Sequence, residues 1–288
     1  MTIEMKNSSL MRPSNQYLLR CALTLVALVA PATASAHGGQ ADSHQQKQVE
    51  LHEGYAYENC YVDLHEDLTQ RDFRKFNAEF GSGFAFTSQS GPRTLGAKHV
   101  ELGVVFRPTN IDDTTDAWNE TWTHPGDDHF LGPVKLPILQ LRVGLSKSTD
   151  LETMFSFGGS NWAIGGVGLR HALLVQGSGM PLDVSLRENV QVARGGSEWT
   201  MVSLGSDLVV GRSFELGAKA ITATPYVAGG ASSALGIESS DEVDLSNVVT
   251  FSPRATAGLD LGLGPARLGV EGTVADVLQW NLHVGAAF

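Results

Sequence analysis

The final nine residues, Trp280–Phe288 (WNLHVGAAF), point to the fold most directly. Trp280, Leu282, Val284, Ala286 and Phe288 fall on one face of an extended chain, and Asn281, His283, Gly285 and Ala287 fall on the other. Alternation with period two predicts a β-strand that has one apolar face. A water-soluble domain gains little from ending on a bare Phe, because terminal residues usually fray into water. The stretch therefore predicts a strand whose apolar face meets something other than water.

This ending resembles the closing strand of bacterial outer-membrane β-barrels, whose assembly machinery recognises an aromatic-ended strand. The resemblance implies a transmembrane antiparallel barrel in the outer membrane of a Gram-negative bacterium, with the barrel-assembly machinery as a partner. It also implies an assembly signal formed by Trp280, Leu282, Val284, Ala286 and Phe288. The resemblance is to the general class of barrels and names no cargo and no reaction.

The N-terminal sequence has the pattern of a secretory signal peptide. Arg12 and Arg20 supply the positive flank, Cys21–Ala30 (CALTLVALVA) is apolar, and Ala34–Ala36 offers a small-residue cleavage site. A membrane-spanning helix needs about 20 apolar residues, so a cleaved signal is favoured over an anchor. The chain has no longer apolar run, so an integral membrane fold would have to be a barrel, which also satisfies every backbone group in lipid.

These features divide the chain into three parts. We expect residues 1–36 to be removed, residues 37–50 (HGGQADSHQQKQVE) to form a polar periplasmic N-terminal arm, and residues 51–288 to form the barrel. Cys60 is then the only cysteine left, which excludes an internal disulfide framework. The net charge of −11 argues against nucleic acid as a partner.

Alternating runs recur along the rest of the chain. In Lys98–Arg107, for example, Val100, Leu102, Val104 and Phe106 share one face. The other runs are Phe76–Phe86, Leu139–Leu145, Leu151–Phe157, Trp162–Val175, Leu182–Val192, Trp199–Val210, Phe214–Val227, Val248–Leu263, Ala266–Val277 and the terminal strand. Each is close to the roughly 9–11 residues with which a tilted strand crosses a bilayer. Trp162–Val175 changes phase near Gly165-Gly166, which predicts a β-bulge.

The number of strands follows from parity. An even number returns the chain to its starting side, so a twelfth strand is expected before Phe76, and Leu51–Val62 is the candidate. We therefore expect an all-β, up-and-down barrel of about twelve strands. Ten strands is the alternative if one apparent pair lies in a loop.

The connections differ in length in a way that fits such a barrel. Those at Ser146–Asp150, Gly211–Ser213 and Gly264-Pro265 are short, whereas Pro108–Pro133 and Gly229–Asn247 are long. Counting strands back from a periplasmic C-terminus puts the three short turns inside and the two long loops outside. Outer-membrane barrels have short periplasmic turns and longer extracellular loops.

Charged residues lie opposite the apolar stripes, where alternation turns them toward the lumen. An Arg or Lys on the lipid face would cost about 2–4 kcal/mol at the bilayer midplane. Two hypotheses remain open: the charges line a solute-selecting pathway, or they pair across a narrow lumen and seal it. The lumen-facing candidates are Glu79, Glu101, Arg107, Arg142, Arg187, Asp207, Arg254, Asp260, Arg267 and Glu271.

The two long loops are acidic and contain no Lys or Arg between Asn110 and Leu131 or between Ile237 and Asn247. Carboxylate oxygens attract divalent cations, which could bridge to lipopolysaccharide phosphates. The candidates are Asp112, Asp113, Asp116, Glu120, Asp127, Asp128, Glu238, Asp241, Glu242 and Asp244. His124 and His129 match no established spacing of metal ligands, so no bound metal and no cofactor is expected.

No catalytic arrangement is evident in the sequence. It has no Gly-x-Ser-x-Gly motif, and His171 and His283 lie in strands beside apolar residues. Trp162, Trp199 and Trp280 begin strands, where they would form an interfacial girdle. We therefore expect no catalytic residues and a passive role.

The expected function is a narrow, porin-like passive channel or a structural outer-membrane protein. The expected partners are outer-membrane lipid, lipopolysaccharide, the assembly machinery, and small solutes or divalent cations, but not nucleic acid. Two alternatives remain: an outer-membrane hydrolase acting on lipid or peptide, and a secreted soluble β-barrel or sandwich that binds a ligand, whose outward faces would be polar.

Overall fold

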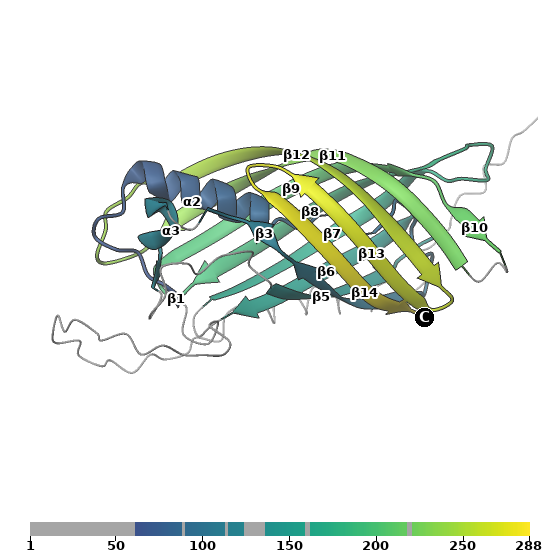
Figure 1. The fold of residues 1–288 in the computed structure, drawn as a ribbon, viewed down its shortest axis with the longest axis horizontal. Coiled ribbons are helices and arrows are strands. Elements are labelled where there is room, and N and C mark those ends of the chain that lie inside the picture. Colours follow the sequence, from purple (N-terminus) through teal and green to yellow (C-terminus); the bar gives the residue numbers. More distant parts are fainter. Residues whose placement is uncertain (1–60, 88–89, 113–114, 124–135, 159–161, 218–220) are drawn as a thin grey trace, which may run out of the picture. The chain divides into compact units, whose positions relative to one another are not determined.

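A computed structural model describes residues 61–87, 90–112, 115–123, 136–158, 162–217 and 221–288. The expected signal peptide, the N-terminal arm and Cys60 lie outside these ranges. The described chain forms a closed barrel in which every neighbouring pair of strands is antiparallel (Figure 1). The ring consists of β2 (Val100–Arg107), β5 (Leu136–Gly144), β6 (Thr149–Gly158), β7 (Trp162–Leu174), β8 (Asp183–Gly195), β9 (Trp199–Gly211), β11 (Ile221–Glu238), β12 (Val248–Leu263), β13 (Ala266–Val274) and β14 (Leu278–Ala287).

The ring closes where the last strand pairs with the first. In β14, Val284 lies opposite Val104 of β2, and Val100 and Phe288 exchange backbone hydrogen bonds of 3.0 and 2.8 Å. Two short strands extend the ladders: β3 (Thr109–Asn110) pairs with β14, and β10 (Phe214–Leu216) pairs with β11. The predicted antiparallel barrel is thus confirmed, with ten strands in the ring and twelve in the sheet.

Two predicted strands differ from the structure. The run Phe214–Val227 is not one strand but is divided into β10 and the first part of β11, which pair antiparallel with each other. Phe76–Phe86 does not enter the ring, because Gln70–Gly83 forms helix α2. A second, shorter helix, α3, covers Asp116–Asn119. Of the expected strand Leu51–Val62, only its last two residues are described; they form β1 (Tyr61–Val62), which pairs with β4 (Trp122–Thr123) in a separate sheet. In the described parts of the chain, no helix is long and apolar enough to cross a membrane.

The outer wall of the barrel is apolar. Phe251 is 70% exposed, Leu204 61% and Leu102 58%, although all three are large hydrophobic side chains on ring strands. Polar residues alternate with them and are buried inside. This inside-out pattern fits a barrel whose exterior contacts lipid. Glu188 is an exception that nothing in the structure explains: it faces outward between Leu169 and Ser206.

Helix α2 begins with a capped turn. The Thr69 hydroxyl accepts a hydrogen bond from the backbone N–H of Asp72, and the Asp72 carboxylate lies in the first turn, where it complements the helix dipole. Phe73, Phe76 and Phe80 recur at intervals of three and four and are fully buried. These three rings line one face of the helix.

That face packs against aromatic side chains from the barrel wall and from α3. The Phe80 ring centroid lies 4.8 Å from that of Trp199 and 6.4 Å from that of Trp162, and the Phe76 ring lies 5.0 Å from that of Trp118. The expected girdle is therefore wrong for Trp162 and Trp199, which point inward, and only Trp280 faces outward, 54% exposed. The inward position of the apolar Trp162 also explains why the alternation of apolar residues changes phase along the sequence of β7. The register shift of that strand lies at Ala172/Leu174 and not at Gly165-Gly166.

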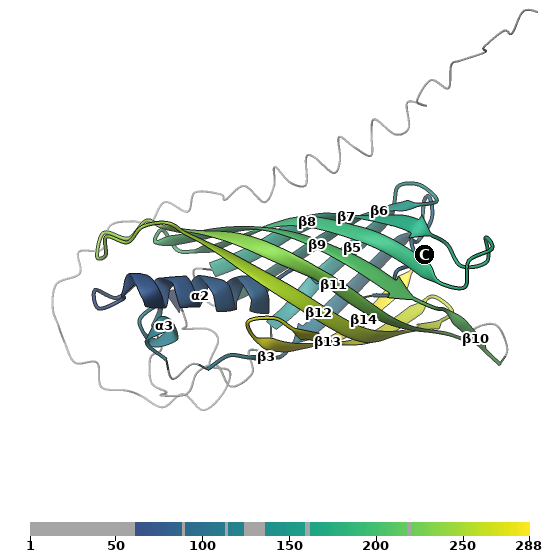
Figure 2. The same cartoon turned by 90° about the horizontal axis from the view of Figure 1, so that it is seen from above.

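The barrel has two distinct ends. Helices α2 and α3 and strand β1 lie at one end, here called the cap end, and the C-terminus lies at the other (Figures 1 and 2). The long connection from β2 to β5 and the one from β11 to β12 are both at the cap end. The second is shorter than predicted, because β11 continues to Glu238 and leaves only residues 239–247 as a loop. The turns at 145–148 and 264–265 lie at the C-terminal end.

Replacing Phe80 by alanine tests the aromatic core. Loss of a buried Phe costs about 3–5 kcal/mol, so Phe80→Ala should lower the urea midpoint of unfolding in detergent micelles, as followed by tryptophan fluorescence. Phe251→Ala, on the lipid face, is the control and should change the midpoint much less. Equal losses in the two variants would contradict an internal aromatic core.

Candidate functional site: the filled lumen

The structure places the ten lumen-facing candidates in different surroundings. Those buried on ring strands are Glu101, Arg107, Arg142, Arg187, Asp207, Arg254 and Glu271. Asp260 is partly exposed on β12. Arg267 lies beside the turn at 264–265 and donates to the carbonyl of Gly264 at 2.9 Å. Glu79 lies on α2, not on a ring strand, and accepts a hydrogen bond of 2.5 Å from Trp118 Nε1.

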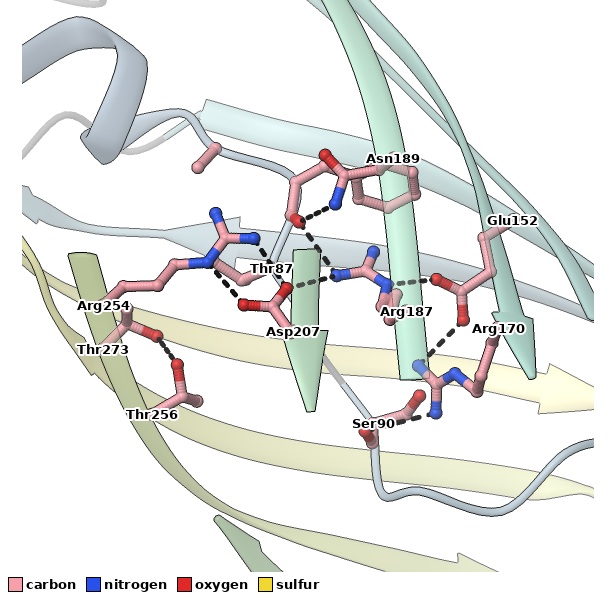
Figure 3. Close-up of polar contacts among 12 residues, drawn as sticks. Thr87, Ser90, Glu152, Arg170, Arg187, Asn189, Asp207, Arg254, Thr256 and Thr273 are labelled. Carbon is pink, nitrogen blue, oxygen red and sulfur yellow. Dashed lines mark hydrogen bonds and ion pairs between the residues drawn. The ribbon is translucent and has the colours of Figure 1, made fainter. Parts of the chain in front are cut away.

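A chain of ion pairs joins strands around the lumen (Figure 3). Glu152 of β6 contacts Arg170 of β7 at 2.8 Å and Arg187 of β8 at 2.5 Å. Asp207 of β9 receives two hydrogen bonds from Arg254 of β12, at 2.7 and 2.6 Å, and lies 3.9 Å from Arg187. The five side chains form one alternating network of charge. Bidentate contacts such as that of Arg254 are the strong form of this interaction.

Gly230 makes the Arg254–Asp207 contact possible. In the ladders, Gly230 of β11 lies directly between Asp207 of β9 and Arg254 of β12. A Cβ atom at this position would collide with the backbone oxygen of Ser206 and with the Asp207 carboxylate. The arginine therefore reaches across a strand that has no side chain at this point.

A second group of charges lies nearer the C-terminal end. Arg142 lies 3.5 Å from Glu101 and 3.4 Å from Asp150. Glu271 accepts hydrogen bonds from the Tyr226 hydroxyl at 2.9 Å and from the Asn281 amide at 2.8 Å. These buried carboxylates of the lumen are thus matched by cations or by hydroxyl and amide donors on other strands of the ring.

The lumen also holds a piece of the chain itself. After α2 the backbone continues through Phe84–Gly91, here called the plug segment, of which residues 88–89 lie outside the description. Arg107 donates to the carbonyl of Ala85 at 2.7 Å, and Arg187 donates to that of Phe86 at 2.8 Å. Arg142 donates to the Ser90 hydroxyl at 2.7 Å, and Arg170 donates to the carbonyl of Gly91.

The plug segment is also tied at both ends. At the cap end, the Gln279 side chain donates to the carbonyl of Ser82 at 2.8 Å. Beyond Gly91, the backbone N–H of Leu95 donates to the Asp150 carboxylate at 3.0 Å, and the Thr94 hydroxyl donates to the carbonyl of Lys147. Arg142, Arg170 and Arg187, which bind carboxylates of the wall, therefore also bind the plug segment, and Arg107 connects it to Asn281 of β14.

Several of these residues are absent from the sequence-based candidates, notably Asp150, Glu152 and Arg170. A signal for the first two existed: Asp150, Glu152, Met154 and Ser156 share one phase of β6 and all are buried. The sequence analysis missed Arg170 because Trp162 and Ile164, which face the lumen from the same strand, β7, are apolar. Their inward position depends on α2, which the sequence analysis interpreted as a strand.

The acidic loops are only partly described. Asp113, Asp127, Asp128, His124 and His129 lie outside the described residues. Glu238 accepts hydrogen bonds from the backbone of Ser240 and Leu245, while Asp241, Glu242 and Asp244 are exposed. Within the described ranges, no group of three His, Cys, Asp or Glu side chains is arranged to hold a metal ion.

The two strand histidines lie apart from each other. His283 is buried in the lumen, where its Nε2 lies 3.8 Å from Glu101. His171 is on the outer wall, where its Nδ1 lies 3.0 Å from the Thr149 hydroxyl. His65, at the cap end, lies 3.0 Å from Glu120.

Glu198 connects the N-terminal segment to the wall. It lies in the turn between β8 and β9, and its carboxylate accepts a hydrogen bond of 2.7 Å from the backbone N–H of Leu64. Partial burial raises the pKa of Glu198, and the nearby carboxylates of Asp63, Glu242 and Glu238 raise it further; together they outweigh the lowering of this pKa by the hydrogen bond from Leu64. The folded protein therefore binds this proton more tightly than the unfolded chain does. The contribution of Glu198 to stability is greatest at acidic pH and decreases as pH rises through its folded-state pKa.

Comparisons with known proteins concern the fold alone. No protein-family model matches the chain, and no curated protein matches it in sequence. Among solved structures, the β-domain of the Bordetella autotransporter BrkA is similar over 66% of this chain and 99% of its own, at 14% identity and a TM-score of 0.43. The KdgM porin is similar over 65% and 99%, at 8% identity and 0.32. The attachment invasion locus protein Ail of Yersinia pestis is similar over 67% and 99%, at 13% identity and 0.25.

Substitution of Gly230 tests the bridge over β11. Gly230→Ala should destabilise the barrel by about 1–3 kcal/mol, because the added methyl group displaces a neighbouring backbone. The matched control is Gly229→Ala, since a Cβ atom at this adjacent position meets nothing within 4 Å. The measurement is the urea midpoint in detergent. A midpoint unchanged in both variants would refute the close approach of β9, β11 and β12.

Neutralising Glu198 tests its link to pH. The thermal midpoint of the wild type, followed by tryptophan fluorescence, should fall as pH rises above about 4.5, the ordinary pKa of a glutamate side chain. Glu198→Gln should flatten this dependence, because an amide oxygen still accepts from Leu64 without carrying charge. Glu215→Gln, which makes the same charge change on exposed β10, should retain it. A wild-type slope that survives in Glu198→Gln would assign the titration to another group.

Proposed function

We propose that this outer-membrane β-barrel is a structural barrel whose lumen is closed by its own plug segment. The apolar outer wall and the closed ring place the chain in the bacterial outer membrane, in contact with lipid. The observation that carries the proposal is the set of hydrogen bonds from Arg107, Arg187, Arg142 and Arg170 to the plug segment. They favour the sealed lumen over the solute-selecting pathway.

The energetics support a permanent seal. The four arginines that hold the plug segment are buried; Arg142, Arg170 and Arg187 are also paired with carboxylates of the wall, and Arg107 donates to the Asn281 amide oxygen. Withdrawal of the plug segment would break the hydrogen bonds between its carbonyl groups and the guanidinium groups of these arginines. Each hydrogen bond to a charged group contributes about 1.5–3 kcal/mol, so the withdrawal would be costly. The aromatic core around Phe80 holds helix α2, which precedes the plug segment, at the cap end. We therefore expect no ion flow through the resting barrel.

The partners proposed for this barrel follow from its surfaces. Trp280, Leu282, Val284 and Phe288 line the outward face of the closing strand, which supports recognition by the barrel-assembly machinery. Asp116 of α3, Glu120 directly after this helix and the exposed carboxylates of 238–247 lie at the cap end, which supports an acidic rim that recruits divalent cations beside lipopolysaccharide phosphates. Catalysis forms no part of the proposal.

Planar-bilayer recording tests the closed lumen. Wild-type barrel should give no current steps above baseline in ordinary salts, whereas a variant lacking residues 61–91 should conduct, because the plug segment is gone. A variant lacking residues 41–60, which keeps the plug segment, is the control and should be silent. Heat-modifiable migration on a gel verifies that each variant folds. Steady conductance by the wild type would refute the proposal.

A further inference from the structure

The chain enters the barrel at the cap end. Tyr61–Val62 pairs with β4, and the backbone N–H of Asp63 donates to the carbonyl of Thr121 at 3.1 Å. The backbone N–H of Leu64 binds Glu198, in the turn between β8 and β9. These partners all belong to connections at the cap end, so the residues that directly follow position 60 are fixed there.

The chain leaves the lumen at the opposite end. Thr94 and Leu95 bind Lys147 and Asp150, at the turn between β5 and β6. The backbone N–H of Lys98 donates to the carbonyl of Gly144 at 3.0 Å, and Val100 then begins β2 beside Phe288. The chain therefore reaches the C-terminal end of the barrel before the first ring strand begins.

Between these two points the backbone crosses the thickness of the membrane inside the barrel. The eight residue steps from Gly83 to Gly91 reach at most about 26–29 Å when extended. The apolar band of an outer-membrane barrel is about 25 Å tall. The arginines hold the crossing largely through backbone carbonyls, which every residue has, so the grip depends little on which residues occupy the lumen.

Loop length orients the barrel. The connection from β2 to β5, residues 108–135, is by far the longest of the barrel and lies at the cap end, whereas the connections at the other end, 145–148, 175–182, 212–220 and 264–265, are all much shorter. Longer connections face the cell exterior in outer-membrane barrels. The cap end is thus the outer end.

We propose that the residues before Tyr61 emerge on the outside of the cell, so that the barrel anchors an N-terminal segment displayed at the surface. This reverses the sequence-based expectation of a periplasmic arm at residues 37–50. This inference goes beyond the proposal of a closed lumen and is independent of it. A barrel that conducted ions could still display the segment, and a barrel with a sealed lumen could lack a displayed segment.

Cysteine labelling of whole cells tests the display. In a Cys21→Ser, Cys60→Ser background, single cysteines replace Ser43 in the arm, exposed Glu66 at the cap end, exposed Asp241 in the outer loop and exposed Lys147 in the inner turn. A strain with truncated lipopolysaccharide prevents sugars from shielding the outer face. A membrane-impermeant maleimide is applied to intact cells and, separately, to cells with a permeabilised outer membrane.

Ser43→Cys and Glu66→Cys should label on intact cells to the same extent as Asp241→Cys, while Lys147→Cys should label only after permeabilisation. Three results would overturn the proposal: protection of Ser43→Cys and Glu66→Cys together with Lys147→Cys, protection of Ser43→Cys alone, or labelling of Lys147→Cys with protection of Asp241→Cys. The first puts the segment inside, the second turns the arm away from the surface, and the third inverts the barrel.

Discussion

Everything inside this barrel depends on one constraint: a charge in a narrow lumen has little bulk water and must find its partner in the protein. A ring with an apolar outer wall sends its charged residues inward, where an unpaired ion is costly. Arg187 shows how this requirement is met. Its guanidinium binds Glu152, lies 3.9 Å from Asp207, donates to the carbonyl of Phe86 and lies 4.2 Å above the Phe86 ring.

The plug segment and the aromatic core are complementary solutions to filling the same space. Near the C-terminal end, polar walls pair with each other and with the carbonyls of an extended segment. Near the cap end, Trp199 and Met201 of β9 are fully buried against α2, so the lumen there contains an apolar core. The barrel thus has two hydrophobic regions of different kinds, one that faces lipid and one that faces its own helix. The helix holds one end of the extended segment in place.

The sequence predicted the strands of the ring well, but it predicted poorly the segments that lie inside the ring, α2 and the plug segment. The reason is physical. Period two identifies strands that face lipid on one side, and it located nine of the ten ring strands; for β11 it predicted only the first half and assigned the residues from Gly229 onward to a loop. Phe76, Phe80 and Phe84 are spaced by four, which puts them on one face of a strand and nearly on one face of a helix, so their spacing alone does not distinguish the two. The capping pair Thr69 and Asp72 carried the discriminating signal. The arginine contacts to backbone carbonyls leave no pattern in sequence, since a carbonyl belongs to every residue.

The plug segment inside the ring also determines whether the number of membrane crossings is even or odd. Counting strands alone predicts that both termini lie on one side, because ten strands return the chain to where it began. The plug segment adds a crossing that forms no ladder with the wall and so escapes any count of strands. With eleven crossings the two ends lie on opposite faces, and Phe288 and Tyr61 are separated by the membrane. A single extended segment, held by four arginines, is therefore sufficient to reverse the topology that the strands would otherwise impose.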